Sequence, residues 1–354
     1  MAWSCGIVGL PNAGKSTLFK ALTALDVTIE KYPFSTIDPN KAVVPLPDQR
    51  LFDLAKLCHS EKITPATIEI TDVAGLVKGA SRGEGLGNQF LGHLRNVDLL
   101  IHVVAGFEQT PDQEAETPDS RLEIVNLELC LSDLDLVTRR RQKIEPKLKS
   151  GEKTAQFELA LISRLDNHLN RGLSLRELQF THEERLVLDQ LALLTLKEMI
   201  YVYNLSEELF LNPDTSFFPP QSPVVPICAR LEAELIELPE EERVNFLEAY
   251  GIQESRTEKL LQECYNHLKL VTFYTVKGNE ARAWVVPKGI RAVEAAGKVH
   301  TDMERGFINV EVVDWNSLLS EGSITRLREK GMSRVEGRDY PVKDGEVLFF
   351  RFRQ

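Results

Sequence analysis

The sequence predicts an α/β protein built on a doubly wound, mostly parallel sheet, with a helical arm inserted in it and a small α+β domain after it. Short apolar runs that alternate with helical patterns predict the sheet. A long segment with leucines at helical spacing predicts the arm. Runs of β-branched and aromatic residues after residue 270 predict the last part. The chain has 354 residues, which is more than one hydrophobic core usually serves.

The first apolar run, Cys5–Val8, leads into G-L-P-N-A-G-K-S-T at Gly9–Thr17. This stretch fits the P-loop pattern G-x4-G-K-[S/T], and a helical run, Leu18–Leu25, follows it. Glycines let backbone N–H groups approach phosphates, and the helix adds its positive end. We expect these residues to bind a nucleoside triphosphate: Asn12, Ala13, Gly14, Lys15, Ser16 and Thr17. Lys15 would act as a catalytic residue on the β- and γ-phosphates, and Ser16 would ligate Mg²⁺.

A second motif follows the buried run Ile68–Asp72, which continues as D-V-A-G at Asp72–Gly75, as in the GTPase superfamily. We expect Asp72 to orient Mg²⁺ through water and the Gly75 N–H to contact the γ-phosphate as the second catalytic residue. The loop between the two motifs should supply a hydroxyl that closes on the metal. Thr36 is the first candidate for this ligand, and Ser35 is the second.

A glycine-rich stretch, Gly79–Gly92, is typical of a second switch that the γ-phosphate orders. Leu76 stands where Ras-type enzymes place the glutamine that orients the attacking water, so we expect slow intrinsic turnover. The strand Leu99–Val104 contains His102, which we interpret as a core residue rather than a catalyst. His93, beside the second switch, is the alternative contact for water.

The residues that select the nucleotide base should follow the strand Met199–Tyr203, which leads into N-L-S-E at Asn204–Glu207. GTPases carry N-K-x-D here, and the aspartate takes two hydrogen bonds from guanine. A glutamate is one methylene longer, so the two-point contact is misplaced and guanine specificity should be lost. We expect the base to lie beside this motif and the segment after the strand Val224–Ile227. The residues are Asn204, Leu205, Glu207, Cys228 and Ala229.

Three segments with apolar residues at helical spacing predict the arm: Arg121–Lys149, Thr154–Leu169 and Thr181–Lys197. Ser150–Gly151 breaks the pattern, so the first two helices should form an antiparallel hairpin. A basic cluster starts at Arg139–Arg141. It is either a solvated helix face or a contact for an RNA-rich partner.

The C-terminal part changes to strand-like runs. These runs are Val271–Val276, Ala281–Val286, Phe307–Val313 and Val347–Phe350, with short helices at Ala292–Val299 and Ile324–Lys330. We interpret His300–Asp302 as a structural turn, since no third metal ligand stands at a suitable spacing. We interpret Trp284 and Trp315 as core residues rather than platforms for nucleic acid bases.

The composition narrows the class of protein. The net charge of −11 argues against bulk electrostatic binding to nucleic acid, although Lys277–Gln354 carries 14 basic and 12 acidic residues. The five scattered cysteines predict reduced thiols in a cytosolic protein. No apolar run is long enough to cross a bilayer, and the chain enters its first strand at once. We therefore expect a cytoplasmic protein without a membrane segment or signal peptide.

Taken together, the motifs resemble those of the Obg-like ATPases, the YchF group of translation-factor GTPase relatives. The resemblance rests on G-L-P-N-A-G-K-S-T, Y-P-F-S-T-I-D-P-N, D-V-A-G-L-V-K-G-A-S-R-G-E-G-L-G-N-Q-F-L, N-L-S-E and V-P-I-C-A-R-L-E-A-E-L, and on a C-terminal part from R-A-W-V-V-P-K-G to G-R-D-Y-P-V-K-D-G-E-V-L-F-F-R-F. It covers essentially the whole chain. It implies hydrolysis of ATP in preference to GTP, Mg²⁺ at Ser16 and Thr36, and association with the ribosome or its large subunit. It also implies a coiled-coil arm and a C-terminal β-grasp domain of the TGS type.

The chain departs from this resemblance at one point. Relatives carry a histidine in the loop after the strand Leu99–Val104, proposed to assist hydrolysis, but this chain has none between His102 and His168. The group that activates water therefore stays open. Asn12 supports a further hypothesis, K⁺ stimulation, because K⁺-stimulated GTPases place an asparagine there; an ordinary turn residue is the alternative.

These expectations divide the chain into a nucleotide domain at residues 1–125 and 198–268, an arm at 126–197 and a TGS domain at 269–352. The favoured function is a slow ATPase that resets a ribosome-binding switch. We expect a monomer, since no long exposed apolar face demands a dimer. Two alternatives stay open. One is a GTP-binding switch, and the other is a binding module whose output is the ATP-bound form, with incidental hydrolysis.

Overall fold

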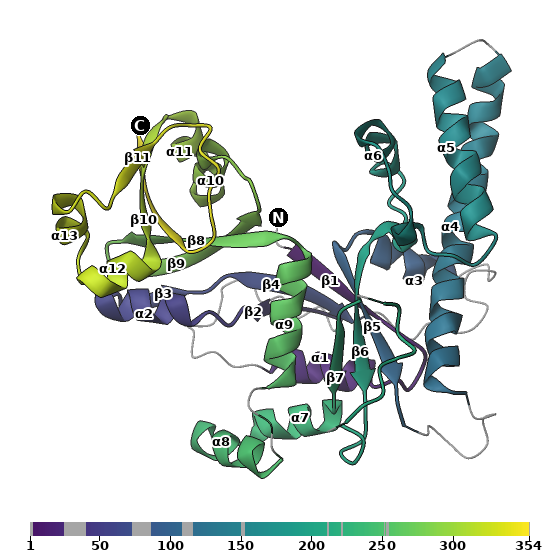
Figure 1. Cartoon of the computed structure of the whole chain (residues 1–354), viewed down its shortest axis with the longest axis horizontal. Helices are drawn as coiled ribbons and strands as arrows, with labels where there is room; N and C mark the ends of the chain where they lie inside the picture. The colour runs from purple at the N-terminus through teal and green to yellow at the C-terminus, as the bar shows by residue number, and fades with distance from the viewer. Residues whose placement is uncertain are drawn as a thin grey trace.

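The computed structural model describes residues 3–24, 40–72, 86–107, 116–149, 153–210, 212–220, 222–250, 252 and 255–353. Thr36, Gly75 and Leu76, which the motifs assign to the metal, the γ-phosphate and the water, lie outside the described residues. Figure 1 shows three parts: a central sheet, a helical arm on one side of it, and a second sheet on the other.

The central sheet is doubly wound and mostly parallel, as the sequence predicts. Its strand order is β2-β4-β1-β5-β6-β7, and β2 alone among these strands runs antiparallel to its neighbour. The strands are β1 (Trp3–Val8), β2 (Lys41–Pro45), β4 (Thr67–Asp72), β5 (Leu99–Ala105), β6 (Glu198–Asn204) and β7 (Val224–Ile227). Every residue of β5 is buried, which fits a parallel strand covered on both faces.

Helices α1 (Lys15–Thr23), α3 (Leu86–Arg95) and α9 (Arg256–His267) cover the two faces of this sheet. Helix α7 (Ala229–Glu237) packs beside α1, and α8 (Glu240–Ala249) follows it. Helix α2 (Gln49–Leu57) packs against the second sheet (Figure 1). On one face, leucines of α1 and α9 pack against Ile7 and Ile101. On the other, leucines of α3 and the first turns of the arm pack against Val8 and Val104. This two-sided packing leaves the carboxyl ends of the strands open for a site.

The arm is an antiparallel pair of helices, α4 (Pro118–Lys149) and α5 (Lys153–Leu169), as the sequence predicts (Figure 1). Leucines, isoleucines and valines along the two helices form one buried cluster. Two arginines of the basic cluster form ion pairs across the hairpin, Arg140 with Glu158 at 2.5 Å and Arg141 with Asp166 at 3.4 Å. These ion pairs occupy Arg140 and Arg141 within the arm, so fewer charges of the basic cluster are available to an external partner.

The predicted helix over Thr181–Lys197 is wrong in length. Helix α6 spans His182–Leu188, and the chain then turns, with Ala192 in the left-handed region (φ 47°), before a 3₁₀ turn at Leu194–Leu196. The cause is tertiary. The fully buried Asp133 of α4 accepts hydrogen bonds from the N–H groups of Leu194 (3.0 Å) and Thr195 (2.7 Å), which a continuous helix would have used internally. A second 3₁₀ turn spans Leu175–Glu177.

The second sheet is mixed, with strand order β11-β10-β12-β8-β9-β3. Its strands are β3 (Lys62–Thr64), β8 (Leu270–Lys277), β9 (Glu280–Pro287), β10 (Phe307–Asp314), β11 (Arg334–Glu336) and β12 (Glu346–Phe352). The helices on this part are α10 (Ala292–Val299), α11 (Thr301–Arg305), α12 (Trp315–Glu321) and α13 (Ile324–Glu329). Strand β3, from the N-terminal part of the chain, pairs in parallel with β9.

The interpretations of the C-terminal side chains are confirmed. His300 caps α11, since its Nδ1 accepts a hydrogen bond from Asp302 N at 3.1 Å. Trp284 packs against the core of the second sheet, with its ring stacked on Phe273, and Trp315 packs against the core shared with the central sheet. Among the described residues, no cluster of three or more His, Cys, Asp or Glu side chains is arranged to hold a metal ion.

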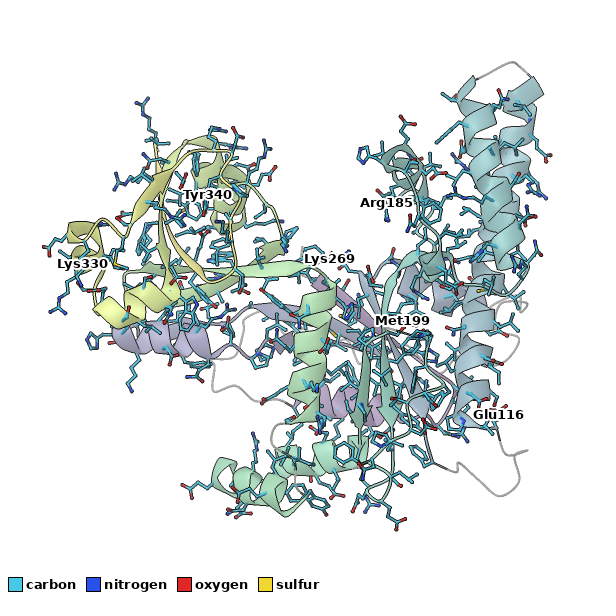
Figure 2. All side chains as sticks on the ribbon, in the orientation of Figure 1. Glu116, Arg185, Met199, Lys269, Lys330 and Tyr340 are labelled. Atoms are coloured by element: carbon cyan, nitrogen blue, oxygen red, sulfur yellow. The ribbon has the colours of Figure 1, made fainter. Side chains whose placement is uncertain are left out.

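A partly buried polar network joins the two sheets. Arg50 of α2 donates hydrogen bonds to Asp48 (2.8 Å) and to Asp344 (2.6 Å), which precedes β12. Asp344 also accepts hydrogen bonds from Tyr265 OH (2.8 Å) and Thr272 N (2.7 Å). The labelled Lys269 marks the short link from α9 to β8 at the same junction (Figure 2). The network therefore ties the segment after β2 to the C-terminal sheet.

The five cysteines are free thiols. Across the described part of the chain, no helix combines the length and the apolar character that crossing a bilayer would require.

Candidate nucleotide-binding site

The P-loop lies between β1 and α1, and two residues give it its shape. Asn12 (φ 61°) and Gly14 (φ 91°) both adopt left-handed backbone angles. Gly9 is needed for space, because a Cβ there would lie 2.5 Å from the carbonyl oxygen of Val103 on β5. Helix α1 begins at Lys15, so its first N–H groups have no partner within the helix and face the loop. This arrangement suits a bound anion.

Lys15 is held inside the loop. Its side chain is buried, with 6% exposed, and its Nζ donates a hydrogen bond to the Leu10 carbonyl oxygen at 2.6 Å. Burial lowers the pKa of Lys15 from its usual value, and the negative charge of Asp72 partly offsets that. The ammonium group therefore lies in a dry setting, where its attraction for a phosphate oxygen is stronger than in water.

Ser16 and Asp72 form the polar side of the loop. Ser16 Oγ donates a hydrogen bond to Asp72 Oδ2 at 3.0 Å, and Asp72 closes β4 opposite Ile7 of β1. The other carboxylate oxygen, Asp72 Oδ1, is buried and has no hydrogen-bond partner among the described residues. An orphaned carboxylate oxygen beside a hydroxyl is the donor set that Mg²⁺ prefers, so these residues fit the metal that the motifs imply.

Asn204, at the end of β6, links three segments. Its Nδ2 donates to the Ala13 carbonyl oxygen at 2.9 Å, and its Oδ1 accepts from Ala229 N at 3.0 Å. Its own carbonyl accepts from Gly106 N at 2.7 Å. Gly14 is required here as well, because a Cβ would lie 2.1 Å from Asn204 Nδ2. The side chain thus clamps the P-loop to the start of α7.

A cavity of about 690 Å³ opens beside this clamp. Predicted site residues line it: Asn12, Gly14, Thr17, Asn204, Leu205, Glu207, Cys228 and Ala229. The remaining predicted loop residues, Ala13, Lys15 and Ser16, sit in the adjoining P-loop. Glu207 and Arg230 line the same cavity, and the pKa of the Arg230 guanidinium group is raised by the hydrogen bond and charge of Glu234 and then by the charge of Glu207.

Four further residues line the cavity, Phe107, Ser206, Glu208 and Arg230. Ser206 and Arg230 belong to the N-L-S-E and C-A-R motifs, whereas sequence reasoning missed Phe107 and Glu208. Phe107 follows β5, and the guanidinium of Arg121 fixes its loop by donating to the carbonyl oxygens of Ala105 (2.8 Å) and Phe107 (2.9 Å). The signal was available, since residues just after neighbouring parallel strands meet at one edge of the sheet.

The two histidines near the site differ in their exposure to solvent. His102 is 1% exposed, and its pKa is lowered to about 3 by burial and then by the charges of Arg176 and Lys15. It is therefore neutral, and its interpretation as a core residue is confirmed. His93 lies exposed in the last turn of α3.

Comparisons with known proteins agree over the whole chain. A family model described as a 50S ribosome-binding GTPase matches residues 4–138, and the YchF C-terminal model, described as a protein of unknown function, matches residues 270–353. The chain is similar to "Ribosome-binding ATPase YchF" of Bacillus subtilis (42% identical over 364 residues, covering 99% of this chain and 100% of that protein). It is similar to the protein of the same name in Escherichia coli O157:H7 (41% identical, covering 99% of each).

Its fold matches the solved structure of the Schizosaccharomyces pombe YchF GTPase, with a TM-score of 0.89 and 30% identity over 99% of this chain and 97% of that one. Sequence, fold and site motifs therefore agree, and the chain belongs to the YchF family of Obg-like ATPases.

Proposed function

We propose that this chain is a Mg²⁺-dependent ATPase that prefers ATP to GTP and works as a slow nucleotide switch on the ribosome. The observation that carries the nucleotide preference is the wall of the cavity, where Glu207 stands in place of the aspartate that pairs with guanine in GTPases. Two relatives at 41% and 42% identity are both named ribosome-binding ATPases, and this name supports ATP as the substrate and the ribosome as the partner.

The proposed chemistry is attack of water on the γ-phosphate of ATP. Lys15 and the N–H groups at the start of α1 would stabilise the negative charge that develops on the phosphates. Ser16 and Thr36 would ligate Mg²⁺ and Asp72 would orient it, while Gly75 would contact the γ-phosphate. The metal supplies charge neutralisation on the phosphate oxygens. Leu76 cannot position water, so turnover should be slow without a partner.

We also propose the domain division at residues 125/126, 197/198 and 268/269. The buried clusters support a boundary close to the first one, because Leu122, Val125 and Leu129 of α4 pack with the central sheet, whereas Val137 and Ile144 pack with α5. Helix α4 would thus run continuously from the nucleotide domain into the arm. The protein would act as a cytoplasmic monomer.

K⁺ stimulation stays a hypothesis that rests on Asn12. Its side chain lines the cavity, and its left-handed backbone equally suits a turn. Hydrolysis rates measured in K⁺ and Na⁺ buffers decide between these roles. Equal rates would leave Asn12 as a turn residue.

The first experiment is an equilibrium titration of the protein with fluorescent ATP and GTP analogues, with and without Mg²⁺. Tighter binding of ATP than of GTP supports the proposal. Glu207→Asp should shift the preference toward GTP, whereas Glu208→Asp, a neighbour in the same wall, serves as the matched control. Equal shifts in the two variants would contradict the role of Glu207.

A guanine-nucleotide switch is the second candidate. The family model is described as a GTPase, and the S. pombe relative is likewise named a YchF GTPase, so both favour it. Tighter binding of GTP than of ATP in the same titration would select it and would reject the role of Glu207 in base selection.

The third candidate is a binding module gated by ATP. Lys15→Ala should abolish association with ribosomes in a co-sedimentation assay if nucleotide binding is required. Under the gated model, a variant that binds ATP without hydrolysing it would still associate with ribosomes. Under the switch model, the same variant would no longer cycle between its nucleotide states.

A further inference from the structure

One buried arginine joins the arm to the wall of the nucleotide cavity. Arg121 lies in the first turn of α4, and only 9% of its surface is exposed. Its Nη1 donates hydrogen bonds to the carbonyl oxygens of Ala105 at 2.8 Å and Phe107 at 2.9 Å. Ala105 is the last residue of β5, and Phe107 lines the cavity. Arg121 therefore acts on the cavity through the backbone that carries Phe107.

This contact is costly to break. A buried cation is tolerated when hydrogen bonds replace the water that it has lost, and here two carbonyl oxygens do so. Hydrogen bonds from a charged donor are about twice as strong as those between neutral groups. The Nε of Arg121 is also buried, and it has no partner among the described residues, so the two carbonyl oxygens are the acceptors that hold the guanidinium group there.

The other side of the same loop is closed by β6. Gly106 N donates to the carbonyl oxygen of Asn204 at 2.7 Å. A Cβ on Gly106 would lie 2.5 Å from atoms of both Tyr203 and Leu205, so the backbone packs tightly against these side chains. The loop is thus held between the end of β6 and Arg121. Because packed groups cannot be compressed, a displacement of Arg121 must move the cavity wall.

The helix that carries Arg121 extends far beyond the site. Helix α4 has 32 residues, which corresponds to a length of about 48 Å. Its first turns pack on the central sheet through Leu122 and Val125, and its outer part lies beside α5, away from the sheet (Figure 1). An ion pair of 2.8 Å between Asp133 and Arg95 joins the same helix to α3, which contains the end of the predicted second switch. A force on the outer part of the arm therefore reaches the nucleotide site through α4.

We propose that Arg121 is a positioning residue for the bound nucleotide. It holds the part of the cavity wall that contains Phe107, and it transmits displacements of the arm to that wall. A partner that docks on the arm would change the affinity for ATP in this way. Because such coupling is reciprocal, ATP binding would in turn restrain the start of α4. This inference rests on the proposed binding of ATP in the cavity.

The first test measures ATP affinity by titration with a fluorescent analogue. Arg121→Met keeps most of the side-chain length and removes the donors, so affinity should fall by about tenfold. Arg121→Lys keeps the charge but has no planar fork for two acceptors, so its loss should be about threefold. The lysine variant also serves as the test if the methionine variant does not fold. Wild-type affinity in either variant would overturn the proposal.

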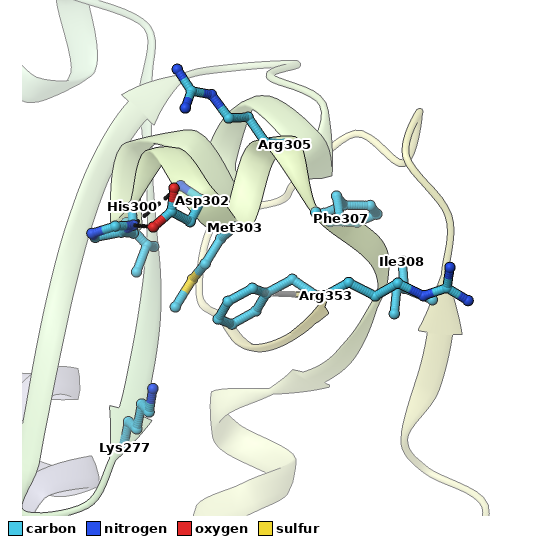
Figure 3. Close-up of a pocket in the computed structure, with 11 residues that line it drawn as sticks. Lys277, His300, Asp302, Met303, Arg305, Phe307, Ile308 and Arg353 are labelled. Atoms are coloured by element: carbon cyan, nitrogen blue, oxygen red, sulfur yellow. Dashed lines mark hydrogen bonds and ion pairs between the residues drawn. The ribbon is translucent and has the colours of Figure 1, made fainter.

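Two arginines elsewhere provide matched controls. Arg243 also holds two carbonyl oxygens, those of Ile236 and Leu238, each at 3.0 Å, but it does not line the cavity. Arg305 is an exposed cation beside a hollow of the C-terminal part (Figure 3). Arg243→Met tests the loss of a backbone contact, and Arg305→Met tests the loss of a charge. Both should bind ATP as wild type does, and a loss equal to that of Arg121→Met would contradict the proposal.

A double-mutant cycle separates positioning from general stabilisation. In a Phe107→Ala background, Arg121→Met should weaken ATP binding by less than about twofold, because the side chain that it positions is already absent. Losses that add would show that Arg121 only stabilises the fold. A further readout is amide hydrogen exchange at saturating ATP. ATP should slow exchange at residues 122–125 in wild type and not in Arg121→Met, whereas equal slowing in both would refute the coupling.

The same titrations keep the two proposals apart. Wild-type protein that does not bind ATP would reject the proposed function. Wild-type protein that binds ATP, together with an Arg121→Met protein that binds it equally well, would reject this inference alone.

Discussion

Asn204→Ala is the substitution whose cost follows most directly from the structure. The side chain is 4% exposed, and it donates to Ala13 O at 2.9 Å and accepts from Ala229 N at 3.0 Å. Truncation leaves a buried carbonyl oxygen and a buried N–H group without these partners. Each unsatisfied group costs about 1–3 kcal/mol, so we expect the free energy of unfolding to fall by about 2–6 kcal/mol.

The same substitution should weaken nucleotide binding, because the clamp holds Ala13, in the middle of the P-loop, against the wall of the cavity. If about half of the lost energy appears in the bound state, ATP affinity falls by about 5-fold to 140-fold. Asn204→Asp keeps the acceptor for Ala229 N but sets a carboxylate oxygen against the Ala13 carbonyl, so it should be at least as damaging.

Urea unfolding and titration with a fluorescent ATP analogue measure the two effects. Asn170→Ala is the matched control, since Asn170 is an exposed asparagine whose Nδ2 donates to Asp166 O at 2.9 Å in the arm. It should change stability by less than about 0.5 kcal/mol. An Asn204→Ala protein within about 0.5 kcal/mol of wild type and with unchanged ATP affinity would refute the clamp.

Three further predictions follow from the same geometry. Gly14→Ala should lower ATP affinity by more than about tenfold, because it strains a φ of 91° and pushes a Cβ against Asn204; wild-type affinity would contradict this. Asp72→Asn should remove most of the Mg²⁺ dependence of ATP binding, and a titration that still responds fully to Mg²⁺ would exclude Asp72 as the metal-orienting group. Asp344→Asn should cost about 1 kcal/mol of unfolding free energy near neutral pH, a small figure because the carboxylate is 44% exposed. Burial alone would raise the pKa of Asp344, but the hydrogen bonds from Thr272, Arg50 and Tyr265 lower it below 3.8. Its stabilisation is therefore complete above pH 3.8 and is lost as the pH falls further, so the gap between variant and wild type should narrow as the pH falls below 3.8 in urea titrations; a constant gap would count against the network.

Local sequence patterns were sufficient for the elements that carry the P-loop. The run Cys5–Val8, the glycines after it and the helical run from Leu18 are neighbours in sequence, so their geometry is local. Asp72 and Asn204 could be placed as well, because both end buried parallel strands and such ends share one edge of the sheet. Phe107 occupies the same edge but lacks a motif, so sequence reasoning did not single it out.

Patterns failed where a distant residue sets the backbone. The helical pattern over Thr181–Lys197 stops at Leu188, because Asp133 captures the N–H groups of Leu194 and Thr195. Strand β3 is three residues long and is stabilised by pairing with β9, more than two hundred positions along the chain. Neither event leaves a local signal in the segment that it reshapes.

The sequence by itself determined the phosphate-binding chemistry, the order of the elements and the family, since motifs of consecutive residues carry all three. The tertiary structure decided which groups meet: Asn204 with Ala13 and Ala229, and Arg50 with Asp344. The physical reason is that hydrogen bonds and charges act over a few ångströms in space, whatever the separation along the chain.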